Sequence, residues 1–356
     1  VVSSGIPAYA ARWDIADGDI TVKGASDENG SYNEVKQGDK GFEKDEGETI
    51  ITGESNKNTV TIDTSEGKVD VTFDDLKINV SGKAEVDGSG KAEVDVSDKT
   101  EVDGSGKTEV DGSGDSPVRE SNAAVTVRGG HDATIELDGD NELKSGGKNA
   151  GLEKNEHESK GTLTIKDDND TKGSLTAEGG EGGGAGIGGG YESGARNIEI
   201  TGGTVKAVGG AGAAGIGGGV YGTGHDIEIS GGKVSATGGN ANKNLESSRT
   251  GAAGIGDGAG TEKDEIDPNA PSNPNHIYIS GDAEVEAKAG ASTGGKTAAI
   301  GGGDVGEIPN SALSDDHHKV TGGSLTRYDP AEKKMEDYSY DRRTPSQTEQ
   351  PDDREN

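Results

Sequence analysis

The chain has 356 residues, and its 67 acidic and 35 basic side chains give a formal net charge of −32 at pH 7. Nucleic acids and anionic membrane surfaces are therefore disfavoured as partners, because their phosphates would be repelled. The sequence contains no cysteine, which excludes disulfides, thiolate metal sites and cysteine nucleophiles. Few large apolar residues and a high charge are typical of disordered chains. Here, however, the apolar residues stand in short alternating triplets at a constant period, which favours an ordered fold.

The first ten residues end in Ala8-Tyr9-Ala10, a small-residue box typical of a signal-peptide cleavage site. We expect residues 1–10 to be a signal-peptide remnant or another leader, and the protein to be secreted. No run of 18 apolar residues follows, so the sequence predicts no transmembrane segment.

We expect residues 11–330 to form a single domain. Residues 11–23 contain the only Trp and suit a first coil or cap, whereas the polar residues 25–48 indicate a loop or an insertion. Strand-like alternation resumes at residues 49–80. An eight-residue repeat in residues 82–116 carries one apolar residue per copy, too little to bury a face, which indicates a low-complexity insertion.

The clearest signal is a repeat of 29 residues in the segment 182–239. A period of this size indicates a stacked solenoid. Looser copies lie on both sides of the segment, and polar insertions at 240–250 and 261–275 widen the later spacings. Loops on one side of a solenoid commonly bind ligands, so we expect recognition there. The repeat places the following residues 29 positions apart: Ile187 and Ile216, Ile198 and Ile227, Ile200 and Ile229, and Val205 and Val234.

Each Ile-x-Ile triplet would point two side chains inward and one outward, as a β-strand does. The Gly-Gly pairs between triplets suit corners, where positive φ or close backbone approach excludes a Cβ atom. Parallel crossovers are overwhelmingly right-handed. The sequence therefore predicts an all-β fold, a right-handed parallel β-helix with Gly-rich corners. Residues 331–356 are charged and lack the period, and we expect a disordered tail or linker there.

The order of several motifs resembles a family of secreted surface proteins of Gram-positive bacteria. The motifs are Trp-Asp-Ile-Ala-Asp-Gly at 13–18, Asn-Thr-Val-Thr-Ile at 58–62, Gly-Ser-Leu-Thr-Ala at 173–177 and Gly-Ala-Gly-Ile-Gly-Gly-Gly at 184–190. Members of this family carry right-handed β-helix modules and are loosely labelled as carbohydrate-binding. The resemblance implies an extracellular, cell-wall-attached location and a monomeric module within a larger surface assembly. It also implies polysaccharide or a host cell-surface glycan as the partner.

Aromatic residues near corners are the candidate glycan contacts, because rings stack on sugar faces. They are Tyr191, Tyr221 and Tyr278. The alternative is that these rings only cover the edge of the apolar column.

Acidic clusters are the candidate Ca²⁺ ligands, because Ca²⁺ prefers oxygen donors. None of them follows the twelve-residue Ca²⁺-binding loop, so a solvated acidic surface is the alternative, and no other cofactor is expected. The clusters comprise Asp138, Asp140, Asp167, Asp168 and Asp170.

Taken together, these features predict a non-catalytic binding or adhesion module that recognises glycan. A structural stalk without a ligand is one alternative. A polysaccharide lyase or hydrolase is the other, and it would need a basic residue or paired carboxylates in a fixed arrangement. We find no recognisable catalytic motif. Residues 290–297 match the phosphate-loop pattern, but a Gly-rich corner follows them where that motif requires a helix.

Overall fold

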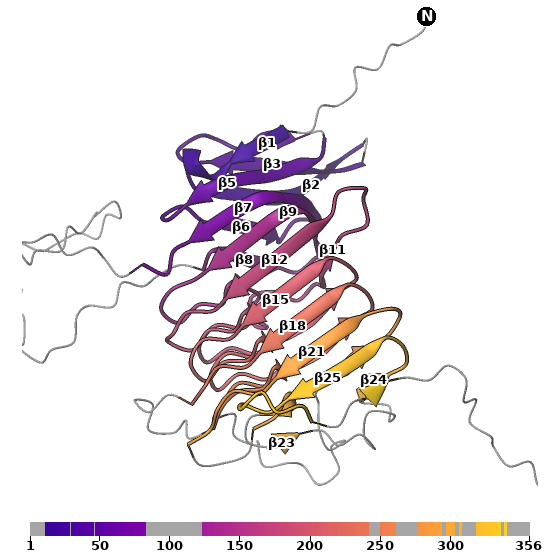
Figure 1. The fold of residues 1–356 in the computed structure, drawn as a ribbon. Coiled ribbons are helices and arrows are strands. Elements are labelled where there is room, and N and C mark those ends of the chain that lie inside the picture. The colour runs from indigo at the N-terminus through magenta and orange to yellow at the C-terminus, as the bar shows by residue number, and fades with distance from the viewer. Residues whose placement is uncertain are drawn as a thin grey trace, which may run out of the picture.

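The computed structural model describes residues 11–28, 30–45, 47–82, 123–241, 250–260, 276–293, 297–302, 306–307, 318–335 and 338–339. The expected leader, nearly all of the low-complexity insertion and most of both expected recognition loops lie outside these residues. The described chain winds into a parallel β-helix whose coils stack from the N-terminal to the C-terminal end (Figure 1). Apart from strands it contains one short 3-10 helix, η1 (Ile15–Asp17).

The coils form three faces, two of which belong to one bent 15-stranded sheet. Strand β9 (Ala133–Lys144) shows the bend, because its first half pairs with β11 (Leu163–Lys166) and its second half with β12 (Gly173–Glu178). We call the side with β11 the first face and the side with β12 the second face. Strands β5 (Thr49–Ser55) and β7 (Val69–Asn79) also belong to this sheet, as does β1 (Ala11–Asp14).

Successive coils extend the first two faces by parallel pairing. The first face continues through β14 (Ala195–Ile200), β17 (Gly224–Ile229), β20 (Ile277–Ile279) and β24 (His318–Val320). The second face continues through β15 (Thr204–Val208), β18 (Lys233–Thr237), β21 (Glu284–Lys288) and β25 (Ser324–Tyr328), which run side by side in Figure 1.

An 11-stranded sheet forms the third face. Its strands shorten toward the C-terminal end, where most contain only two or three residues. Its parallel strands are β2 (Ile20–Asp27), β6 (Val60–Thr64), β8 (Val125–Gly129), β10 (Leu152–Glu153), β13 (Ile187–Gly188), β16 (Ile216–Gly217), β19 (Ile255–Gly256) and β22 (Ile300–Gly302).

The register confirms the 29-residue repeat. Ile187 pairs with Ile216, Ile198 with Ile227, and Val205 with Val234. The wider spacings keep the same register, since Ile216 pairs with Ile255 and Ile255 with Ile300. All these side chains are buried in one apolar column. The insertions are therefore accommodated between strands without displacing the inward positions.

A column of glycines follows these isoleucines on the third face. Gly188, Gly217, Gly256 and Gly301 have φ angles of 135°, 134°, 129° and 126°. A Cβ atom on Gly217 would lie 2.0 Å from the carbonyl oxygen of Gly256. Both the positive φ and the close approach of the next coil therefore require glycine at this position.

Short antiparallel strands lie at both ends of the solenoid. At the N-terminal end, β3 (Gly30–Gln37) pairs with β2, and β4 (Glu43–Asp45) pairs with β3. The expectation of a loop or insertion at residues 25–48 is therefore wrong for this hairpin, whose Val35 is buried in the core. The signal was weak because two of the three inward positions of β3, Asn33 and Gln37, are polar.

At the C-terminal end, β23 (Gly306–Glu307) pairs antiparallel with β22, and β26 (Tyr338–Ser339) pairs antiparallel with β25. The expected tail at 331–356 therefore needs correction, since its residues 338–339 belong to a strand. Antiparallel end strands occupy sheet edges that would otherwise be open to pairing with another chain. Residues 340–356 lie outside the described part.

Candidate functional site

A groove of about 700 Å³ lies on the outer side of the first face, near the N-terminal end. Its floor consists of outward-facing residues of three consecutive strands, and the pairing register aligns them in two rows. One row is Asp70, Thr134 and Thr164, and the other is Thr72, Glu136 and Lys166.

Strict alternation places these polar side chains outside the column. On β9, for example, Ile135 is buried in the core between Thr134 and Glu136. Since successive side chains of a strand point to opposite faces, the neighbours of each inward apolar residue must point outward. Stacking of the coils then brings residues that are 30 or more positions apart in the sequence into one row.

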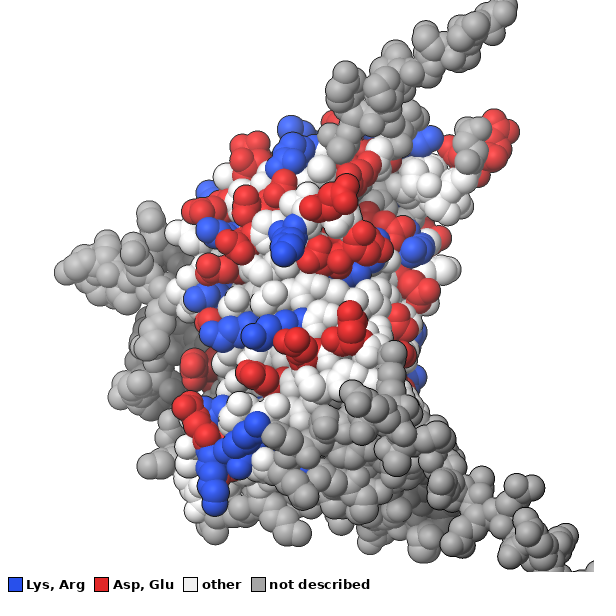
Figure 2. Space-filling model, turned by 45° about the vertical axis from the view of Figure 1, so that its right-hand side comes forward, with Lys and Arg blue, Asp and Glu red and all other residues white. Residues whose placement is uncertain are grey.

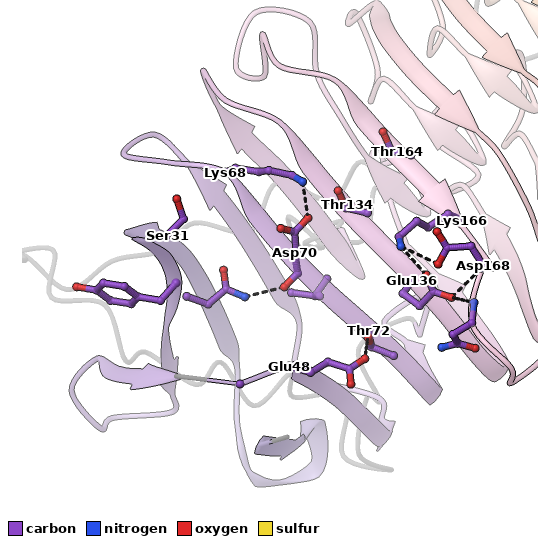
Figure 3. A pocket seen from close by; sticks show the side chains of 15 residues that line it. Ser31, Glu48, Lys68, Asp70, Thr72, Thr134, Glu136, Thr164, Lys166 and Asp168 are labelled. Atoms are coloured by element: carbon purple, nitrogen blue, oxygen red, sulfur yellow. Dashed lines mark hydrogen bonds and ion pairs between the residues drawn. The ribbon is translucent and has the colours of Figure 1, made fainter. Parts of the chain in front are cut away.

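Strand β3 and the segment after β4 supply one side of the groove. The amide Nδ2 of Asn33 donates to the backbone oxygen of Asp70 at 2.6 Å and to the hydroxyl of Thr49 at 2.9 Å. The hydroxyl of Thr72 donates to Oε1 of Glu48 at 2.5 Å. These contacts attach the hairpin to the solenoid, and they position Ser31 and Tyr32 along the groove (Figure 3).

Ion pairs lie within the groove (Figure 3). Lys68 Nζ is 3.0 Å from Oδ1 of Asp70, and Lys166 Nζ is 2.8 Å from Oδ1 of Asp168 and 3.1 Å from Oε2 of Glu136. Hydrogen bonding to Asp168, followed by hydrogen bonding to Glu136, raises the pKa of Lys166. The same contact with Lys166 lowers the pKa of Asp168. Both side chains are therefore charged at neutral pH.

The first row continues beyond the groove toward the C-terminal end. Thr164 pairs with Glu199, Glu199 with Glu228, and Glu228 with Tyr278. The hydroxyl of Thr164 also donates to Oε2 of Glu199 at 3.2 Å. Neighbouring strands of a sheet are about 4.8 Å apart, so the row is a straight series of side chains at that spacing.

The structure separates the three predicted tyrosines into two places. The rings of Tyr191 and Tyr221 meet edge to face at the corner between the third and first faces, with centroids 5.6 Å apart. Lys148 Nζ lies 3.9 Å from the centroid of the Tyr191 ring. Tyr278 instead lies on β20 in the row described above, and its ring centroid is 6.1 Å from that of His276.

The predicted acidic residues gather at the corner between the first and second faces. Asp138 and Asp140 flank the bend of β9 at Gly139, and the remaining three lie between β11 and β12. Oδ1 of Asp138 accepts a hydrogen bond from Asn169 Nδ2 at 2.7 Å, and Oδ1 of Asp140 accepts one from Ser174 Oγ at 2.8 Å.

The other three predicted acidic residues also differ in their surroundings. Oδ2 of Asp167 accepts a hydrogen bond from the backbone N–H of Gly173 at 3.2 Å, Asp168 is paired with Lys166, and Asp170 is exposed. In the described part of the chain, no three His, Asp or Glu side chains are grouped so that they could hold a metal ion. A Ca²⁺ site formed by these five residues stays a prediction.

Sequence reasoning singled out Asp168 but missed the other groove residues, although part of the signal was available. Thr134, Glu136 and Thr164 occupy outward positions of recognisable strands, so their orientation could have been read from the alternation. Their neighbours Tyr32 and Glu48 could not have been found in this way, because they belong to the segment expected to be a loop.

Comparison with known proteins supports the fold. A family model described as a β-helix repeat matches residues 198–220 and 227–259. These ranges include β15, β16, β18 and β19. No curated protein and no solved structure matches the chain. Within the described residues, no helix has the length and apolar character needed to cross a membrane.

Proposed function

We propose that this chain is a non-catalytic, extracellular glycan-binding module and that the glycan lies along the first face, starting in the groove. The observation that carries this proposal is the straight outward row from Asp70 through Thr134 and Thr164 to Glu199 and beyond. A row that presents one polar side chain per coil suits a polymer that presents hydroxyl groups at regular intervals.

The chemistry of the groove supports a sugar ligand. Hydroxyl groups both donate and accept hydrogen bonds, and carboxylates accept them, so Ser31, Thr134 and Asp70 can together match the donors and acceptors of a sugar ring. Tyr32 lies along the groove and Tyr278 lies further along the same face, and both offer aromatic surface against which sugar rings can pack.

The charge states of Lys166 and Asp168 argue against a proton-transfer role for these two residues. A lyase requires a neutral base beside the sugar, but the carboxylate contacts that raise the pKa of Lys166 keep it protonated. A hydrolase requires one protonated carboxylic acid, but contact with Lys166 lowers the pKa of Asp168 and keeps it ionised. These two residues are therefore suited to holding a ligand rather than to exchanging protons with it.

The wider context of the proposal rests on the family resemblance. It favours an extracellular location, with the chain acting as one module of a cell-surface assembly that binds polysaccharide or a host glycan. Ca²⁺ at the acidic corner between β11 and β12 would be a second ligand, beside the glycan.

A glycan array probed with and without Ca²⁺ tests the proposal. We expect binding that a Thr134→Val/Thr164→Val double variant abolishes. A Thr176→Val/Thr204→Val double variant removes two outward hydroxyl groups from the second face and should bind normally. An array without any bound glycan would contradict the proposal and favour a structural stalk. Release of unsaturated or newly reducing oligosaccharides would instead show an enzyme.

A further inference from the structure

The charges that line the groove are not balanced. Four lining residues carry carboxylates, and two carry ammonium groups, Lys68 and Lys166. Both ammonium groups already contact carboxylates of the groove, at distances between 2.8 and 3.1 Å. An anionic ligand would therefore meet surplus negative charge and, among the lining residues, no cation that lacks a carboxylate partner. The four carboxylates are those of Glu48, Asp70, Glu136 and Asp168.

Glu136 adds a separate observation to this imbalance. Its side chain lies in the groove floor and is only 7% exposed. Oε1 accepts hydrogen bonds from the backbone N–H groups of Asp168 and Asn169 at 3.0 and 3.3 Å. Oε2 is buried and lies 3.1 Å from the ammonium group of Lys166. Glu136 therefore takes up part of the charge of Lys166, which leaves this ammonium group less available to an anionic ligand.

The negative charge continues along the same face. The row that leaves the groove at Thr164 passes through Glu199 and then Glu228, so two consecutive coils present a carboxylate. Figure 2 shows Asp and Glu side chains interspersed with Lys and Arg on one side of the solenoid. The net charge of −32 adds a long-range field of the same sign as the row.

We infer that the first face selects a glycan whose repeating unit carries a primary ammonium group, such as a polymer of glucosamine, over acetylated and uronate glycans. This inference rests on the proposed function and names its ligand class. An ammonium group has three donors and no acceptor, so it complements a row of carboxylates. A uronate carboxylate would be repelled, and an acetylated amine would lose the charge-assisted hydrogen bonds that distinguish the amine.

Isothermal titration calorimetry with three pentasaccharides tests this selection. The probes are those of glucosamine, N-acetylglucosamine and galacturonic acid, at a pH at which the amine is protonated. We expect the glucosamine form to bind about ten-fold more tightly than the acetylated form, the gain expected from one or two charge-assisted hydrogen bonds. This advantage should shrink as salt is added, and the uronate should not bind.

Each alternative result has a distinct meaning. Equal binding of the amine and acetylated forms, or preference for the uronate, would overturn the inference and leave the proposed function intact. If none of the three pentasaccharides binds but the glycan array is positive, the inference is overturned and the proposed function stands. An array without any bound glycan would overturn the proposed function itself. Binding of a lysine pentapeptide as tightly as the glucosamine pentamer would also overturn the inference, because charge alone would then suffice.

Matched variants locate the selective charge. A Glu199→Gln/Glu228→Gln variant should lose about ten-fold in affinity for the glucosamine pentamer and keep its affinity for the acetylated one. The control is Glu284→Gln/Glu286→Gln, which removes two exposed carboxylates from the second face. Equal losses in both variants would show an effect of overall charge and overturn the assignment to the first face. Thermal unfolding of both variants checks that the fold is retained.

Discussion

Oδ1 of Asn141 accepts a hydrogen bond of 2.9 Å from the backbone N–H of Leu76 inside the apolar column. Asn141 is 1% exposed and occupies an inward position that Leu175 fills on the next coil. Its Nδ2 donates to the backbone oxygens of Asp138 and Ser174 at 3.1 and 3.0 Å. The register of β7 against β9 shifts between Asp74 and Lys77. The Asn141 side chain therefore forms its hydrogen bond to the β7 backbone at the point where the regular pairing is interrupted.

Replacement of Asn141 by Ala should therefore destabilise the fold by about 3 kcal/mol, because it leaves a buried N–H and two partly buried carbonyl groups without this partner. Urea denaturation measures the change in the free energy of unfolding. Asn79→Ala is the control, since Asn79 is exposed at the end of the neighbouring strand β7 and should change stability by less than about 0.5 kcal/mol. Equal effects at the two positions would contradict the role given to Asn141.

Gly217→Ala should be severely destabilising, by about 3 kcal/mol or more, because the new Cβ atom would meet the Gly256 carbonyl oxygen at a φ unsuited to alanine. Gly130→Ala is the matched control, since a Cβ atom there has no neighbour within 4 Å. Thermal unfolding followed by circular dichroism compares the two variants. A Gly217→Ala variant as stable as the parent would refute the close stacking of the third face.

Lys154 gives a pH-dependent prediction. Its side chain is fully buried, and burial, with a contribution from the charge of Arg196, lowers the pKa of Lys154 to about 8 from the ordinary 10.5. The folded state therefore binds this proton more weakly than the unfolded state, and the ammonium form opposes folding below pH 8. Stability should rise with pH between about 8 and 10.5 as this opposition disappears.

The Lys154→Met variant should be more stable than the parent at pH 7, by about 3 kcal/mol as an upper value, with no such advantage above pH 10.5. Denaturant unfolding at pH 7, 9 and 10.5 measures this difference. Lys172→Met, at an exposed position, should change stability little at any pH. If the difference in the free energy of unfolding between the parent and Lys154→Met were the same at all three pH values, the lowered pKa of Lys154 would be contradicted.

The tyrosines should differ in their effects on glycan binding. Tyr278→Ala should weaken binding to a glycan identified on the array, because Tyr278 lies in the row that continues the groove. Tyr191→Ala should leave affinity within about two-fold, and should lower stability by about 1 kcal/mol through loss of the edge-to-face contact with Tyr221. Calorimetry and thermal unfolding give the two readouts. Loss of binding in Tyr191→Ala alone would move the site to the corner of the third face.

The sequence by itself determined the coil and its register. Ile187, Ile216, Ile255 and Ile300 stack in one column although their spacings are 29, 39 and 45 residues. Alternation within a strand is a local property, and burial allows only one register for an inward side chain. The glycine that follows each of these isoleucines could also be predicted from the sequence. It recurs on every coil because the backbone of the next coil approaches this position closely each time.

Only the tertiary structure decided where the groove lies. The β2–β3 hairpin has no periodic signature, yet the contacts of Asn33 with Thr49 and with the backbone of Asp70 attach it to the first face. Lateral neighbours such as Asp70 and Thr134 are separated in the sequence by the whole low-complexity insertion, so their proximity depends on how the coils stack rather than on local pattern. The burial of Lys154 has the same origin, because solvent exposure is set by packing between coils and not by residue type.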